Sequence, residues 1–269
     1  MFRLNLDFLA KRVDNAIKNA ANIALDYYNK REKGWLKKDG TWLAKADPVI
    51  EKFLRCELNA AVDEIHSTIR LFGEEEGWTG PEEAEYTGII DPIEGTALFA
   101  HQIPLWGIAA SLFKGKKMLM AGFAMPAIKQ FFFAISDRGA TLNGNPLEVA
   151  PKPITKDLYL GVSSNAHRWN LTGYPGKVRA YGSTGFHVIG VATGVIQAAF
   201  LTRFKFYDLV TPALIHKEAG GELIYYPSGQ SVNFSDLLKV ESSKPILACH
   251  PQQVSEFIKM NFHELEDRR

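Results

Sequence analysis

Apolar residues recur every three or four positions near the N-terminus, and this spacing predicts a long amphipathic helix. The apolar positions are Leu6, Leu9, Val13, Ile17, Ala20, Ala24 and Tyr28. We expect this helix to end before Gly34 and to bury its apolar stripe against a sheet or another helix. A second helix is expected to begin at Pro48, with Asp47 as its N-cap, and to run through Val62.

Short apolar runs between turn residues predict strands, and their arrangement differs between the two halves of the chain. In the first half, strands are expected near residues 68–72, 86–91, 107–113, 117–125 and 130–135, with a short helix from Gly95. The last three of these strands are predicted to form an antiparallel meander. After Pro151 and Pro153, strands near 157–163, 195–201, 204–207 and 222–226 alternate with helices near 183–194 and 212–219. The first half is therefore predicted to be α+β and the second α/β.

The domain organisation expected from this pattern is a single folding unit, residues 1–269, with two lobes that share a crevice. The lobes are residues 1–150, of α+β type, and residues 151–269, of α/β type. No low-complexity linker separates them, and no internal repeat is visible. A chain of 269 residues can bury roughly 75% of its unfolded surface without disulfides or structural metals.

Composition narrows the functional classes. Hydrophobic residues make up 46% of the chain and charged residues 23%, as in soluble globular proteins. A net charge of +1 argues against a nucleic-acid polymer as partner. No apolar run approaches the ~20 residues that span a bilayer, and no signal-peptide core is present, so we expect a cytoplasmic protein without a membrane partner. Cys56 and Cys249 lack disulfide or metal-ligand spacing, and Cys56 is interpreted as a packing residue of the second helix.

The run Ile90-Asp91-Pro92-Ile93-Glu94-Gly95-Thr96 carries the strongest chemical signal in the chain. It places two carboxylates and a hydroxyl between an apolar strand and a helix start. Mg²⁺ prefers oxygen ligands and is usually held by one or two carboxylates together with substrate phosphate. The amides of Gly95 and Thr96 would face that phosphate, because unpaired N–H groups at a helix start favour an anion. The alternative is an ordinary turn, since Asp-Pro and Glu-Gly are common in loops.

Two further acidic positions favour the metal hypothesis. Glu74 lies in Gly73-Glu74-Glu75-Glu76-Gly77 at the end of one predicted strand. Asp208 lies between the predicted strand 204–207 and the helix that follows. Three strand ends that each carry a carboxylate are expected to converge on one site.

The order and spacing of these motifs resemble the inositol monophosphatase-like family of Mg²⁺-dependent, lithium-sensitive phosphatases. The resemblance covers nearly the whole chain and rests on Gly73-Glu74-Glu75, Asp91-Pro92-Ile93-Glu94-Gly95-Thr96, Pro104-Leu105-Trp106-Gly107, Gly182-Ser183-Thr184-Gly185, and Tyr207-Asp208 followed by Glu218-Ala219-Gly220-Gly221. It implies the layered αβαβα sandwich of the sugar phosphatases, with the metal-binding residues mostly in the first lobe. It also implies a homodimer, to which the apolar strand 130–135 would contribute unless that strand is buried on both faces.

The resemblance assigns roles to residues of this sequence by position. Two or three Mg²⁺ ions, or Mn²⁺, would be held by Glu74, Asp91, the Ile93 carbonyl, Glu94, Thr96 and Asp208, with Asp91 bridging. Asp47, Thr96 and Glu74 would be catalytic, and Asp47 with Thr96 would help to deprotonate the attacking water. Two metals about 3.5 to 4 Å apart can activate that water and stabilise the leaving oxygen. The predicted substrate and phosphate contacts are Gly95, Thr96, Ser183, Arg203, Lys205, His167 and Arg168. Lys37 and Lys38 lie close to the position of a basic residue in the family.

The sequence departs from the family pattern at two positions. Glu94 stands where the family normally has Asp, and its side chain is longer by roughly 1.3 Å, whereas metal–ligand distances tolerate only about 0.2 Å. This change would weaken Mg²⁺ binding, favour Mn²⁺, or mark a protein without turnover. Leu201 occupies, by ungapped count from Asp208, the place of an acidic residue that contacts the inositol ring. An apolar side chain cannot accept a sugar hydroxyl, which argues against myo-inositol 1-phosphate.

We therefore predict a metal-dependent phosphatase that hydrolyses a phosphomonoester of a small polyol, sugar or related metabolite. One alternative is a phosphatase for 3′-phosphonucleotides, for which Arg168, Arg203 and Lys205 would supply a second anion contact, or a phosphatase for histidinol phosphate. Another is a relative that binds metal or phosphometabolites with little turnover, because of Glu94. Fold and metal site are shared among these possibilities, whereas specificity resides in the loops.

Overall fold

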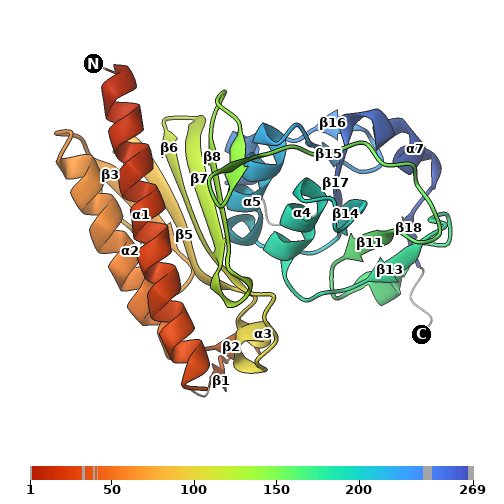
Figure 1. Cartoon of the computed structure of the whole chain (residues 1–269), viewed down its shortest axis with the longest axis horizontal. Helices are drawn as coiled ribbons and strands as arrows, with labels where there is room; N and C mark the ends of the chain where they lie inside the picture. The colour runs from red at the N-terminus through yellow and green to blue at the C-terminus, as the bar shows by residue number, and fades with distance from the viewer. Residues whose placement is uncertain (1, 32–33, 39, 41, 239–243, 266–269) are drawn as a thin grey trace.

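The computed structural model describes residues 2–31, 34–38, 40, 42–238 and 244–265. Two long helices, α1 (Phe2–Asn29) and α2 (Ala46–Asp63), lie side by side and cover one face of an eight-stranded sheet (Figure 1). The apolar stripe predicted for the first helix is the face that packs there: Leu9, Val13 and Ile17 belong to a core shared with α2 and the sheet. Between the helices, β1 (Trp35–Leu36) pairs with β2 (Trp42–Leu43).

The eight-stranded sheet has the order β10-β9-β8-β7-β6-β5-β3-β4. Its strands are β3 (Ile69–Gly73), β4 (Gly77–Thr79), β5 (Tyr86–Glu94), β6 (Gly107–Lys114), β7 (Lys117–Met125), β8 (Gln130–Ile135), β9 (Ala140–Leu142) and β10 (Asn145–Leu147), with α3 (Thr96–Ala100) after β5 and the short helix η1 (Pro126–Ile128) after β7. β5 to β10 form a continuous antiparallel meander, and β3 joins β5 in parallel. The predicted meander is confirmed and is longer than expected.

A second, six-stranded sheet has the order β13-β11-β14-β17-β15-β16. Its strands are β11 (Tyr159–Val162), β13 (Lys177–Arg179), β14 (Ala198–Leu201), β15 (Glu222–Tyr225), β16 (Gln230–Ser231) and β17 (Ile246–Cys249). The remaining elements are η2 (Ala166–Arg168), β12 (Trp169–Asn170) paired with β18 (His263–Glu264), α4 (Thr184–Ala192), α5 (Phe206–Glu218), α6 (Phe234–Leu237), η3 (Pro251–Gln253) and α7 (Val254–Lys259). β11 is parallel to β13 and β14, and the other pairings of this sheet are antiparallel.

The layers follow one another as helices, sheet, helices, sheet and helix (Figure 1). α4 and α5 form the middle layer, because Ile189 and Leu214 pack on the first sheet while Val188 and Leu209 pack on the second. Phe257 of α7 covers the outer face of the second sheet. This is the αβαβα sandwich that the resemblance of the motifs implies. The division into lobes at residue 150 stays a prediction.

Three local predictions are wrong. Residues 204–207 do not form a strand: the Asp208 carboxylate accepts the N–H of Lys205 at 3.1 Å, and this cap starts α5 at Phe206. Asp47 is not the N-cap of α2, because the helix begins one residue before it and Lys45 takes the N-cap position. Cys56 lies on the exposed face of α2 rather than in the core.

β8 is not buried on both faces. Phe132 and Ala134 are in the core, whereas Phe131, Phe133 and Ile135 are half-buried and pack beside α1. A homodimer that uses this strand stays a prediction.

Candidate metal and phosphate site

A cavity of about 1200 Å³ opens between the two sheets and collects nearly all of the predicted site residues. Those that line it are Glu74, Asp91, Ile93, Glu94, Gly95, Thr96, His167, Arg168, Ser183, Arg203, Lys205 and Asp208. They come from the end of β3, the end of β5, the start of α4, the loop after β11 and the start of α5. Asp47 is the one predicted residue that does not line the cavity.

The end of β5 is irregular, and this irregularity shapes the site. Asp91 pairs with Ala109 of β6, but the register shifts before Glu94 pairs with Gly107. Pro92 falls inside this bulge, where a proline does not break a regular ladder. Gly95 then adopts φ 86°, a left-handed conformation that glycine takes without strain, and α3 begins at Thr96. The Thr96 hydroxyl donates to the Ile93 carbonyl at 2.9 Å.

Asp91 lies at the centre of the acidic cluster. Its side chain is 1% exposed, and Oδ1 has no hydrogen-bond partner among the described residues. Burial, followed by the charges of Glu74, Asp208 and Glu94, raises the pKa of Asp91 well above its ordinary value. Burial and Glu94 likewise raise the pKa of Asp208. Carboxylates that disfavour each other's charge in this way would be stabilised by a cation bound between them.

Glu74 lies in the turn between β3 and β4, as predicted from its place after a strand. Burial raises the pKa of Glu74. The ammonium of Lys37, which lies 3.4 Å from Oε1, lowers it. Lys37 also pairs with Glu75 at 2.6 Å. A cation from the loop before α2 therefore already neutralises part of this edge of the cavity.

Glu94 lines the cavity with the other carboxylates, but both of its oxygens are hydrogen-bonded to the start of α4. Ser183 Oγ donates to Oε2, and the N–H of Thr184 donates to Oε1 at 2.7 Å. Ser183 is the N-cap of α4, so Glu94 supplies an anion to the positive end of that helix. Burial raises the pKa of Glu94 to about 7, although these hydrogen bonds lower it. The additional methylene of Glu, compared with Asp, allows the side chain to reach α4.

Asp47 is fully buried beneath the cavity, close enough for its charge to affect Asp91. Its Oδ2 accepts the N–H of Ala44 at 2.6 Å, and Oδ1 is buried without a partner among the described residues. Burial raises its pKa well above the ordinary value. The side chain thus orders the chain that leads into α2, and its catalytic role stays a prediction.

The oxygen atoms of this cluster are of the kind that binds a hard divalent cation. Asp91 Oδ1 lacks a partner among the described residues, and the neighbouring side chains are carboxylates. As they stand, no three Asp, Glu, His or Cys side chains in the part of the chain that the structure describes are arranged to hold an ion. In this arrangement Glu94 is hydrogen-bonded to α4, and Glu74 pairs with Lys37. Glu74, Asp91, Asp208 and the Ile93 carbonyl would hold the ion, and these ligands stay predictions.

A second group of residues that line the cavity is basic and is called the basic wall below. His167 and Arg168 follow β11, and Arg203 and Lys205 precede α5; all four side chains are exposed and line the cavity. Within the described residues, the guanidinium groups of Arg168 and Arg203 have no carboxylate partner.

The position of Leu201 in the structure contradicts the argument against myo-inositol 1-phosphate that was based on this residue. Leu201 ends β14, is fully buried in the core and does not line the cavity. Thr202 is the first residue after β14 that reaches the cavity. The case against myo-inositol 1-phosphate that rested on Leu201 is therefore wrong.

Sequence reasoning missed Glu51 and Arg55 of α2, which are buried next to the Glu74 turn. A signal for them was present. Asp47, Glu51 and Arg55 recur every four residues on the same helix face as Leu54 and Leu58, which are core positions. Charged residues on a core-facing stripe require buried partners.

Comparison with known proteins decides the family. A model of the inositol monophosphatase family matches residues 5–259. The chain belongs to the inositol monophosphatase family. A histidinol-phosphatase from Chlorobaculum parvum is 29% identical over 223 residues, which cover 79% of this chain and 84% of that relative. The family and the class of phosphoric monoester hydrolases predicted from the motifs are thereby confirmed.

Solved structures of the family share the fold. The extragenic suppressor protein SuhB from Bartonella henselae superimposes with a TM-score of 0.80 at 19% identity, covering 94% of this chain and 97% of that one. An IMPase/NADP phosphatase complexed with Mg²⁺ and phosphate gives 0.77 at 19% identity and covers 95% of both chains. The layered sandwich is therefore confirmed. Of the helices that the structure describes, none is both long and apolar enough to cross a bilayer.

Proposed function

We propose that this member of the inositol monophosphatase family is a divalent-metal-dependent phosphatase that hydrolyses a phosphomonoester of a small polyol, sugar or related metabolite. The observation that carries the proposal is the buried Asp91 carboxylate at the base of a large cavity, with Glu74 and Asp208 beside it. Mutually repelling carboxylates are unfavourable in the folded protein unless a cation or bound protons neutralise them. A cavity of about 1200 Å³ accommodates a small metabolite with room for solvent.

The residues around the cavity would have different roles in the reaction. Bound divalent ions would supply the positive charge that activates water and stabilises the oxygens of the displacement. Thr96 Oγ1 donates its hydrogen bond to the Ile93 carbonyl at 2.9 Å, so its lone pairs are free to accept a hydrogen bond from the attacking water and orient it. The amides at the start of α3 would orient the phosphate. The family resemblance favours Asp47 as an aid to Thr96, and a relative with Mg²⁺ and phosphate supports the choice of ion.

A phosphoester panel, assayed in parallel with Mg²⁺ and Mn²⁺, tests this function. Phosphate release should require metal, stop in EDTA and be nearly abolished in Asp91→Asn. Undiminished release in EDTA would contradict the proposal. Calorimetric binding of phosphoesters without hydrolysis of any of them would favour a binding protein with little turnover, an outcome that the position of Glu94 makes worth testing.

The basic wall favours one narrower substrate class. Arg168 and Arg203 line the same cavity as the carboxylates and lack carboxylate partners within the described residues. A substrate with a second phosphate, such as a 3′-phosphonucleotide, would neutralise them, whereas histidinol phosphate would bring its cationic end toward them. The test compares a nucleoside 3′,5′-bisphosphate with the 3′-monophosphate. Arg203→Ala should raise KM for the bisphosphate alone, and an equal effect on both substrates would contradict this specificity.

A further inference from the structure

Two oppositely charged residues are buried on the sheet-facing side of α2. Glu51 is 0% exposed and Arg55 is 7% exposed. Arg55 Nε and Nη2 both donate to Glu51 Oε1, at 2.9 and 2.8 Å. The pair lies one helical turn apart and directly below the turn that connects β3 to β4. Neither residue lines the cavity.

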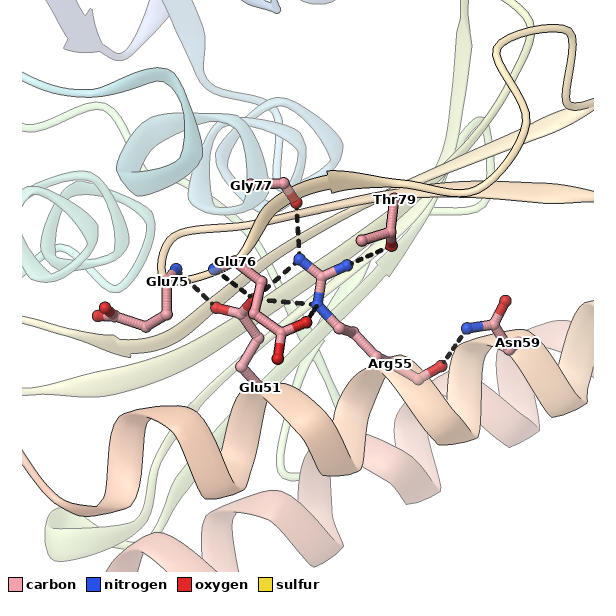
Figure 2. A network of polar contacts seen from close by, with 7 residues as sticks. All are labelled: Glu51, Arg55, Asn59, Glu75, Glu76, Gly77 and Thr79. Carbon is pink, nitrogen blue, oxygen red and sulfur yellow. Dashed lines mark hydrogen bonds and ion pairs between the residues drawn. The ribbon is translucent and has the colours of Figure 1, made fainter.

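Both members of the pair hold the backbone of that turn (Figure 2). Glu51 Oε2 accepts the N–H of Glu75 at 2.8 Å, and Oε1 accepts the N–H of Glu76 at 3.1 Å. Arg55 Nη2 donates to the Gly77 carbonyl at 2.7 Å. The three residues that follow Glu74 are therefore fixed from below, while the Glu74 side chain remains at the cavity.

The approach of the pair to the turn leaves no space for a side chain at Gly73. A Cβ atom there would overlap Glu51 Oε1 and would lie 2.7 Å from Arg55 Nη2. Glycine immediately before Glu74 is thus a requirement of this contact. Arg55 Nη1 completes the network by donating to Thr79 Oγ1 of β4 at 2.7 Å.

Stability alone does not account for such an arrangement. Removing two charges from water costs several kcal/mol per ion, and apolar residues of similar volume are often equally stable in place of a buried ion pair. A fully hydrogen-bonded network does fix one geometry, because each member is bound by several others. The geometry fixed here is that of the turn that carries Glu74.

We infer that Glu51 and Arg55 are a positioning pair that holds the 74–77 turn, and hence the Glu74 carboxylate, in place for a divalent ion before that ion binds. The inference rests on the proposed function for the role of Glu74 as a ligand. The pair acts through the backbone and touches neither ion nor substrate. Partners of this kind typically contribute 10- to 100-fold to metal affinity when they orient a ligand.

The experiment compares Glu51→Gln with Glu57→Gln, which makes the same chemical change on the same helix but away from the turn. Two quantities are measured on the full chain: amide hydrogen exchange at residues 75 and 76 in EDTA, and the Kd for Mn²⁺ by calorimetry. The amide introduced by Glu51→Gln keeps one acceptor oxygen and places an N–H₂ group against existing donors. We expect faster exchange at both backbone amides and a Kd raised about 10- to 100-fold, with Glu57→Gln unchanged. The rate at saturating Mn²⁺ should stay near that of the wild type.

A milder variant covers the case in which Glu51→Gln fails to fold. Thr79→Val removes only the hydrogen bond from Arg55 Nη1 and keeps the side-chain shape. It should shift exchange and Kd in the same direction by a smaller factor. A lower melting temperature with unchanged Mn²⁺ affinity would make the pair purely structural and overturn the inference, leaving the proposed function intact. Wild-type protein that binds no Mn²⁺ would overturn both, since Glu74 would then not be a ligand.

Discussion

The contact between Glu94 and α4 makes Glu94→Asp the most informative substitution in the site. In the wild-type protein, the Thr184 N–H lies 2.7 Å from Glu94 Oε1, and Ser183 Oγ donates to Oε2. Removing one methylene withdraws the carboxylate by roughly 1.3 Å. The distance to the Thr184 nitrogen would then be about 4 Å, beyond the ~3.2 Å limit of a hydrogen bond. The shorter side chain would release α4 and face the other carboxylates.

The magnitude follows from those two contacts. Hydrogen bonds to charged groups contribute about 1.5 to 3 kcal/mol each, so an ion that recruits Glu94 must offset at least one or two of them. Since about 1.4 kcal/mol corresponds to a tenfold change in affinity, the half-saturating Mg²⁺ concentration should fall about 10- to 100-fold in Glu94→Asp. The same variant should melt at a lower temperature in EDTA, because α4 loses the anion at its N-terminus.

The assay is phosphate release titrated with Mg²⁺, together with thermal unfolding in EDTA. Glu83→Asp is the matched control, because Glu83 is exposed and should leave both quantities unchanged. An unaltered Mg²⁺ requirement in Glu94→Asp would refute the reasoning. It would show that the hold of α4 on Glu94 does not compete with metal binding.

Three further predictions concern the same cluster. Asp91→Asn should raise the melting temperature in EDTA above that of the wild type, because it removes a buried charge. The same variant should abolish stabilisation by Mg²⁺. A lower melting temperature in EDTA would contradict the repulsion between Asp91 and its neighbouring carboxylates. The pKa of Glu94 rises from 4.5 to about 7 on folding, so between those pH values the folded protein keeps a proton that the unfolded chain has released. The contribution of Glu94 to the unfolding free energy of the metal-free protein should therefore fall by about 3 kcal/mol as pH rises through that window, and denaturant titrations of Glu94→Gln should show a correspondingly flatter profile. Gly95→Ala should destabilise the turn by about 1 kcal/mol, because φ is 86° there, and weaken inhibition by inorganic phosphate; unchanged inhibition would mean that these amides do not bind it.

Much of the architecture could be predicted because the responsible signals are local. The helical spacing from Leu6 to Tyr28 and the turns between strands 107–135 specify α1 and the meander without reference to the rest of the chain. Strand β17 gave no separate prediction, since its pairing with β14 and β15 joins segments far apart in sequence. Residues 204–207 were mispredicted because one capping hydrogen bond from Asp208 outweighed the strand preference of an aromatic run.

The sequence could predict which residue types form the candidate site, but not how their side chains are oriented. The predicted carboxylates converge on one cavity, but Asp208 reaches it from the first turn of α5 and not from the end of a strand. The direction of Glu94 could not be foreseen, because it depends on where the N-terminus of α4 lies in the fold. Leu201 shows the limit of counting along an ungapped sequence: a shift of one residue separates a core position from Thr202, which lines the cavity.

The central claim is that carboxylates from three distant segments hold divalent ions at the base of the cavity. Anomalous diffraction from crystals grown with Mn²⁺ and phosphate tests it most directly. The account predicts a Mn²⁺ peak in contact with the Asp91 carboxylate, with Glu74 or Asp208 as a second ligand and phosphate beside Gly95 and Thr96. A cavity without such a peak at saturating Mn²⁺, or a peak bound elsewhere with Asp91 still lacking a partner, would contradict it.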